Sequence, residues 1–156
     1  MAEDLTERLE LYKLSVEMAD RISARRGEAN KFFVTLETAL AGLAGLVRPS
    51  EPILGGAIKV DSWGIAIACI IGLVLSGTWW LLLRSYRDLN EAKFKVILSM
   101  EKDLPAAPFG DEWNHLKKDP VKPLARRYAE LGVIERAVPV VFAGVYIGIS
   151  VRTFFG

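Results

Sequence analysis

Hydrophobic and polar residues follow one another in long blocks along this chain. Residues 63–83 form a run of 21 residues without a charge or a proline. At a rise of about 1.5 Å per residue, a helix of this length covers roughly 30 Å, which is the thickness of a bilayer's hydrocarbon core. Residues 84–104 follow directly, with charged, helix-forming sequence and no glycine or proline. The pattern predicts one continuous helix, a membrane span extended by a cytoplasmic half.

Two further segments are apolar enough to be membrane helices. Residues 32–47 contain Glu37, and an acidic residue at membrane depth costs about 2.5–3.5 kcal/mol. A lone helix of this kind inserts reluctantly, but a bundle of helices offsets the cost. Residues 137–155 form the third predicted span, with Pro139 expected in its first turn. Residues 1–31 precede the first span as an amphipathic cytoplasmic helix, because their apolar residues recur at spacings of three and four.

The remaining segments connect these helices. Residues 48–62 read as a short external loop with two prolines and a Gly-Gly pair. Residues 105–136 read as a proline-rich cytoplasmic loop followed by a short surface helix. The predicted fold is therefore an all-α membrane protein with three transmembrane helices, the first two extended into a cytoplasmic antiparallel helical hairpin.

The distribution of lysine and arginine predicts the orientation. Of the 20 basic residues, 17 lie in the N-terminal segment and the middle segment 84–136, and three lie in the loop 48–62 and the C-terminal tail. Since basic residues stay on the cytoplasmic side of bacterial membranes, the N-terminus is expected inside. Three spans then place the C-terminus outside, in a multi-pass protein of the inner membrane.

Small residues recur every fourth position on all three predicted spans. Because lipid offers no hydrophobic drive between helices, membrane helices associate through close backbone approach at such faces. Packing within one protomer accounts for part of this pattern, but three such faces favour self-association. The predicted interface residues are Ala41, Gly45, Gly64, Ala68, Gly72, Ser76, Gly144 and Gly148.

Glu37 is the residue most open to a functional interpretation, because ionisable residues inside membranes usually have a partner and a role. An ion pair with Arg84 is one hypothesis. An axial polar path lined by Glu37 with Thr35 and Thr38 is a second, and it predicts an oligomeric pore. A water-filled but inert lumen is a third.

A basic run of Arg21, Arg25, Arg26 and Lys31 leads up to the expected inner membrane surface. These residues either bind anionic lipid headgroups or pair with the acidic residues of the opposed helix. The two interpretations stay open. The net charge of +1 argues against nucleic acid as a partner.

The sequence carries no motif for a catalytic site, a metal site or a cofactor. The single histidine, His115, lies in the proline-bounded loop beside Asp111 and Glu112, and a solvated loop residue is the expected role. Catalysis needs a positioned base and nucleophile, so we expect a protein that is not an enzyme and holds no cofactor or metal.

Four blocks resemble the RipA-type family of small bacterial inner-membrane proteins. They are YKLSVEMADRISARRGEANKFF at 12–33, WLLLRSYRDLNEAKFKVI at 80–97, EKDLPAAPFGDEW at 101–113 and IERAVPVVF at 134–142. The resemblance implies a polytopic membrane protein that forms homo-oligomers, described for the family as octamers, and members are linked to bacterial adaptation. It carries no catalytic residues.

These observations lead to one functional hypothesis with one alternative. The first is a membrane scaffold or adaptation factor that self-assembles and presents a cytoplasmic helical platform to a partner still unknown. The alternative is an oligomeric pore or ion channel, with a layout similar to small membrane effectors of bacterial defence systems.

Overall fold

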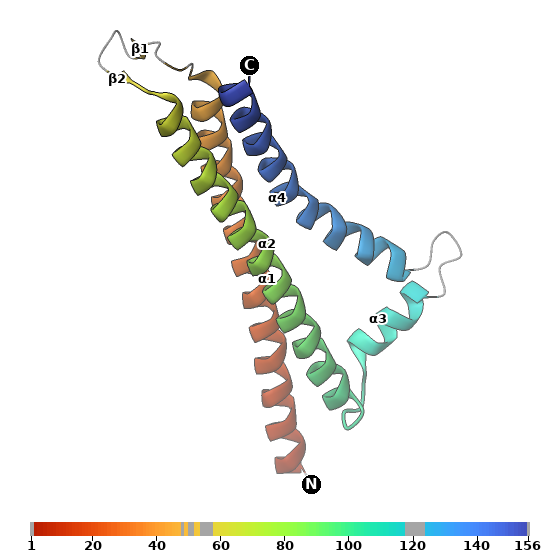
Figure 1. Cartoon of the computed structure of the whole chain (residues 1–156). Coiled ribbons are helices and arrows are strands. Elements are labelled where there is room, and N and C mark those ends of the chain that lie inside the picture. The colour runs from red at the N-terminus through yellow and green to blue at the C-terminus, as the bar shows by residue number, and fades with distance from the viewer. Residues whose placement is uncertain (1, 48, 50–51, 54–57, 118–123, 156) are drawn as a thin grey trace. The chain divides into compact units, whose positions relative to one another are not determined.

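The computed structural model describes residues 2–47, 49, 52–53, 58–117 and 124–155. Within these residues the fold is helical, with one pair of two-residue strands (Figure 1). The elements in chain order are α1 (Ala2–Leu46), β1 (Pro52–Ile53), β2 (Ile58–Lys59), α2 (Ser62–Glu101), α3 (Pro108–Lys117) and α4 (Leu124–Phe155). The strands β1 and β2 are antiparallel, with Pro52 opposite Lys59 and Ile53 opposite Ile58.

The helices α1 and α2 are 45 and 40 residues long, and each runs without a break through an apolar and a charged stretch. Asp61 starts α2, since its carboxylate accepts a hydrogen bond from the Gly64 amide at 2.8 Å. At the C-terminal end of α1, the Arg152 guanidinium of α4 donates to the carbonyls of Gly45 and Val47 at 3.1 and 3.4 Å. Arginine thereby satisfies carbonyls that the end of α1 leaves without intrahelical partners.

Two sequence-based expectations for the segment after residue 104 were wrong. Pro108–Lys117 form the helix α3 rather than a loop. Proline is favourable at the first position of a helix, where its missing amide hydrogen would have had no intrahelical acceptor. The surface helix and the third span are one helix, α4, so Pro139 lies inside it rather than in its first turn. Proline there interrupts the ladder of backbone hydrogen bonds.

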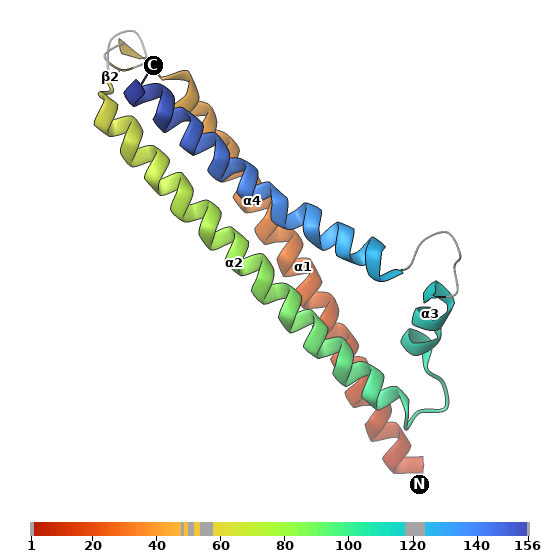
Figure 2. The ribbon, with the colours of Figure 1, turned by 45° about the vertical axis from the view of Figure 1, so that its right-hand side comes forward.

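The chain divides into two compact units, which we describe separately. The charged unit comprises Met1–Gly27 and Arg84–Ile134, and the apolar unit comprises Glu28–Leu83 and Glu135–Gly156. Each unit contains a part of α1, α2 and α4, and α3 belongs to the charged unit. Within each unit α1 and α2 lie side by side and antiparallel (Figures 1 and 2).

The core of the apolar unit consists of two clusters. The first packs α1, α2 and α4 together through Ala44, Ile65, Cys69, Tyr146 and Ile149. The second is built on Trp79, whose ring stacks on Phe33 with centroids 5.6 Å apart and whose indole Nε1–H donates to Asn30 Oδ1 at 2.9 Å. Buried tryptophan thus has both an apolar contact and a partner for its polar atom.

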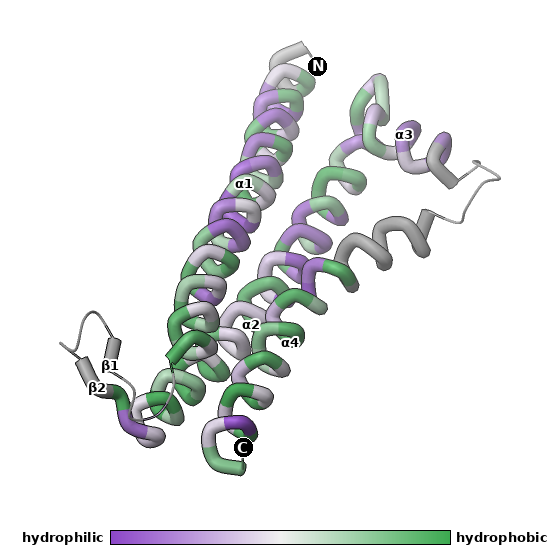
Figure 3. The backbone as a smooth tube through the Cα atoms, turned by 90° about the horizontal axis from the view of Figure 1, so that it is seen from above, coloured by the Kyte–Doolittle hydropathy of each residue, from purple (hydrophilic) through white to green (hydrophobic). Residues whose placement is uncertain are grey.

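Two helices among the described residues are long and apolar enough to cross a membrane. They are α2 and the part of α4 from Ile134 to Phe155. The apolar half of α1 does not pass the same test, so the three-span layout remains a prediction. Many large hydrophobic side chains of the apolar unit are exposed, among them Leu43, Ile67 and Val141. Figure 3 colours the backbone by hydropathy, and the apolar parts of α1, α2 and α4 are mostly green in it.

The packing of Gly72 generates a first prediction. A Cβ atom at this position would collide with the ring of Tyr146, so Gly72→Ala should destabilise the protein by about 1–3 kcal/mol. The control is Gly77→Ala, five residues further along the same helix, where an added Cβ meets nothing within 4 Å. In thermal unfolding in detergent, G72A should melt about 2–4 °C lower per kcal/mol lost, and G77A should melt as the natural protein or slightly higher. Equal melting of both variants would contradict the packing.

Candidate functional site

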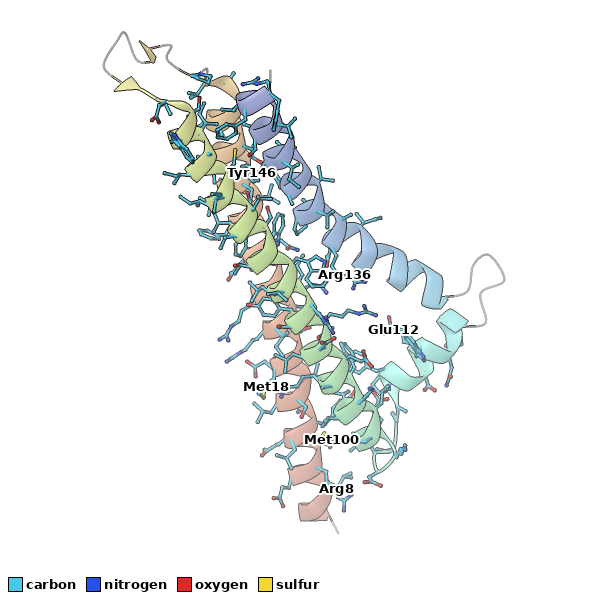
Figure 4. The ribbon with its side chains drawn as sticks, viewed as in Figure 1. Arg8, Met18, Met100, Glu112, Arg136 and Tyr146 are labelled. Carbon is cyan, nitrogen blue, oxygen red and sulfur yellow. The ribbon has the colours of Figure 1, made fainter. Side chains whose placement is uncertain are left out.

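A buried carboxylate joins the three helices of the apolar unit. The side chain of Glu37, on α1, is fully buried. Its Oε1 accepts a hydrogen bond from the Ser76 hydroxyl of α2 at 2.8 Å, and its Oε2 accepts one from the Tyr146 hydroxyl of α4 at 2.6 Å. The donors are themselves 2% and 0% exposed. We call these three residues the Glu37 cluster (Tyr146 is labelled in Figure 4).

The small residues of α2 make room for this cluster. Gly72 lies one turn before Ser76, and the ring of Tyr146 occupies the space that a side chain at 72 would fill. The Tyr146 hydroxyl also lies 3.2 Å from the backbone carbonyl of Glu37, so it meets both the side chain and the main chain of α1. Two of the predicted interface residues, Gly72 and Ser76, therefore pack inside the protomer.

The other small residues lie in different surroundings. A Cβ added at Gly64 would meet Val60 and Asp61 at the start of α2, and one added at Gly45 would meet Ile149 at 3.8 Å. Ala41 and Ala68 are partly buried. Gly144 and Gly148 are exposed, and an added Cβ at either would meet nothing within 4 Å. Their role in an interface between copies stays a prediction.

The structure gives Glu37 other partners than those predicted from the sequence. Both carboxylate oxygens accept hydroxyl donors, and the interactions of the described residues include no ion pair with Arg84. Thr35 and Thr38 are exposed, whereas Glu37 is buried, so these residues do not share one surface of the protomer. Thr35 donates to the carbonyl of Lys31 on its own helix at 2.9 Å.

The charged unit contains a second buried carboxylate, that of Glu101 at the end of α2. Its Oε1 accepts hydrogen bonds from the Tyr12 hydroxyl of α1 and from the Phe109 amide, both at 2.9 Å. Its Oε2 accepts one from the Gly110 amide at 2.8 Å. The two amides belong to the first turn of α3, so Glu101 supplies acceptors to a helix N-terminus, where negative charge is favourable.

The surroundings of Tyr12 shift the pKa of its phenol. Burial, together with the hydrogen bond to Glu101 and the charge of that carboxylate, raises the pKa of the Tyr12 phenol to about 12. The neutral phenol is thus retained as a donor at every physiological pH. Around it, Arg8 pairs with Asp103 at 3.3 Å, and the ring of Phe94 meets that of Phe109 edge to face.

The basic run predicted at the membrane surface is only partly paired. Arg21 pairs with Glu17 on its own helix at 2.7 Å, and Arg26 has interactions of its own. Arg25 and Lys31 are exposed. Binding to lipid headgroups stays a prediction for them. Among the described residues, no group of three or more His, Cys, Asp or Glu side chains is placed to hold a metal ion, and His115 is exposed.

Sequence reasoning missed the partners of both carboxylates. Tyr146 is 109 residues from Glu37, and Tyr12 is 89 residues from Glu101. One signal was present for the first of these: Tyr146 is the single tyrosine in the apolar run 137–155, where its hydroxyl needs an acceptor.

The Glu37 cluster generates a second prediction. Tyr146→Phe keeps the ring but removes the donor, so one buried carboxylate oxygen loses its hydrogen bond. This should cost about 1–3 kcal/mol. We expect the effect to depend on Glu37: in a double-mutant cycle, the loss for Y146F should shrink when Glu37 is also changed to Gln. Thermal unfolding of the four proteins checks this, and additive losses would show that the two groups are not coupled.

The Glu101 contacts generate a third prediction. Glu101→Gln replaces one acceptor oxygen with an NH2 group that faces an N–H or O–H donor, so the first turn of α3 should lose its anchor. Hydrogen–deuterium exchange of the peptide spanning 108–117 should speed up at least several-fold, since the exchange rate follows the free energy of local opening. Glu91→Gln, at an exposed i,i+4 pair with Lys95, is the matched control and should leave α3 unchanged. Unchanged exchange in E101Q would contradict the anchor.

The chain matches one family of known proteins. The octameric membrane protein family (8xMP) matches residues 9–155 of the chain. No curated protein and no solved structure matches it. The match covers both units and confirms the family that the four sequence blocks indicated. The chain therefore belongs to the octameric membrane protein family.

Proposed function

We propose that this chain is a non-enzymatic scaffold of the bacterial inner membrane, which assembles into an octamer and presents its charged unit as a cytoplasmic platform. The observation that carries the proposal is the division of the chain into an apolar unit and a charged unit along the same helices. In the apolar unit the polar side chains of the Glu37 cluster satisfy one another internally, as a membrane requires. Membership of an octameric family supports the assembly.

Three spans are the proposed layout of the apolar unit. Two helices qualify by length and hydropathy alone, and α1 is the third. Burying Glu37 in the membrane opposes insertion of α1, and hydrogen bonds from the hydroxyl groups of α2 and α4 offset this cost. The bundle, rather than the hydropathy of α1, supports its place in the membrane.

The orientation follows from the basic residues. The segments 1–31 and 84–136 carry 17 of the 20 lysines and arginines, which supports a cytoplasmic N-terminus and charged unit. With three spans the C-terminus is external. The proposed partners are other copies of the chain, anionic lipids at Arg25 and Lys31, and a cytoplasmic protein at the platform.

A structural role for both buried carboxylates favours a scaffold over an enzyme or a pore. Both oxygens of Glu37 and both oxygens of Glu101 accept hydrogen bonds from groups of other helices, so each carboxylate contributes to packing inside the protomer. A pore lined by Glu37 would require the Glu37 cluster to open.

Single-particle imaging of the protein in nanodiscs, combined with ion flux in liposomes, tests the proposal. We expect eight copies around an axis filled by lipid or apolar side chains, and no flux above that of empty liposomes. An open axis lined by Glu37, Thr35 and Thr38, with flux that Glu37→Ala abolishes, would replace the scaffold by the channel. A monomer in the nanodisc would contradict both.

A further inference from the structure

Among the described residues of the charged unit, a set of large apolar side chains is exposed. Leu11, Leu14 and Met18 on α1 and Leu89 and Val96 on α2 are each between 41% and 52% exposed. On α1 they recur at spacings of three and four, and on α2 at a spacing of seven, so each set forms a stripe along one side of its helix. We call the two stripes together the seam. In the proposed topology the seam lies in the cytoplasm, where lipid does not cover it.

The two stripes form one continuous surface. Lys93 lies between Leu89 and Val96 on the surface of α2, four residues after the first and three before the second. Its ammonium group reaches the sulfur of Met18 at 3.8 Å. The α1 stripe and the α2 stripe therefore face the same side of the helix pair.

The helix α3 covers the opposite side. An open groove between α1 and α3 is lined by Lys13, Val16 and Asp20 together with Pro108 and Phe109. Lys13, Val16 and Asp20 each follow a residue of the seam by two positions, which is a rotation of about 200° around the helix. Figure 4 shows this arrangement within the charged unit: Met18 points away from the side on which α3 lies.

A second copy of this chain is the occupant that these faces fit. An octamer closed by one kind of contact needs two different surfaces on each protomer, because a surface that pairs with itself stops at a dimer. The charged unit has two such surfaces on opposite sides, the seam and α3. The exposed part of α3 offers an aromatic anchor in the partly exposed Trp113, which is flanked by acidic Asp111 and Glu112.

The charges at the two surfaces are complementary. The α1 stripe continues past Met18 to the exposed Arg21 and Arg25. Because Arg21 pairs with Glu17 on its own helix, Arg25 supplies the positive charge at this end of the stripe. When a neighbouring α3 lies along this stripe, its Asp111 and Glu112 meet the positive charge of Arg25 at the edge, which favours this partner over a like-charged one.

From these observations we infer that the seam binds α3 of the neighbouring copy, and that this contact, repeated around the ring, closes the octamer on its cytoplasmic side. The inference rests on the proposed assembly, and it assigns the contact to helical segments outside the predicted spans. The exposed glycines Gly144 and Gly148 are then free to face lipid.

Cysteine cross-linking tests the inference on the full chain in membranes. In a Cys69→Ala background, Leu14→Cys is combined with Asn114→Cys, an exposed position beside Trp113 that leaves the anchor intact. A short bifunctional maleimide should then give a ladder of covalent multimers that reaches eight copies, because each link joins different protomers. Lys13→Cys with Asn114→Cys is the matched control: residue 13 neighbours residue 14 but faces α3, and no ladder is expected.

Three outcomes would overturn the inference. A covalent dimer from Leu14→Cys alone would show that the seam pairs with itself. An equal ladder from the Lys13→Cys pair would show random collision. Absence of the ladder, while native mass spectrometry of the same variant still gives an octamer, would place the interface elsewhere and leave the proposed function intact. Absence of the octamer in the natural chain would instead contradict the proposed function.

Discussion

The hydrogen bonds of the Glu37 carboxylate are the constraint on which the apolar unit depends. An isolated carboxylate in this position would make α1 a poor membrane helix, because no water is present to solvate it. Donors from α2 and α4 satisfy both oxygens, and in doing so they fix the register of all three helices. Gly72 belongs to the same arrangement, since Tyr146 reaches Glu37 only through the space above that glycine.

The charged unit also contains a buried carboxylate that holds other segments in place. Glu101 is buried and accepts a tyrosine hydroxyl and two amides, so a carboxylate from α2 again holds two other segments. The ion pairs of this unit, such as Arg8 with Asp103, are exposed and contribute about 0–1 kcal/mol each. The specific geometry of both units therefore comes from carboxylates with neutral donors rather than from pairs of opposite charge.

This explains what the sequence could and could not predict. Blocks of hydropathy and long stretches without glycine or proline predicted the extents of α1 and α2 closely, because these are local properties. The helix α3 was missed because its N-terminus is stabilised by Glu101, outside the helix, while its own proline and glycine resemble loop signals. The hypothesis of an ion pair between Glu37 and Arg84 was based on their opposite charges. Glu37 instead has the hydrogen-bond partners Ser76 and Tyr146, which are neutral and lie 39 and 109 residues away, so no rule of local spacing identifies them.

We propose that the apolar half of α1 lies in the membrane because the Glu37 cluster holds it there. Spin labels placed singly at exposed positions along 32–47, such as Leu43, report this directly through their accessibility to oxygen and to a water-soluble nickel complex. In liposomes the natural chain should show high oxygen and low nickel accessibility across this segment, and the Tyr146→Phe variant should shift toward the aqueous reagent. Nickel accessibility along the whole of 32–47 in the natural chain would contradict the claim.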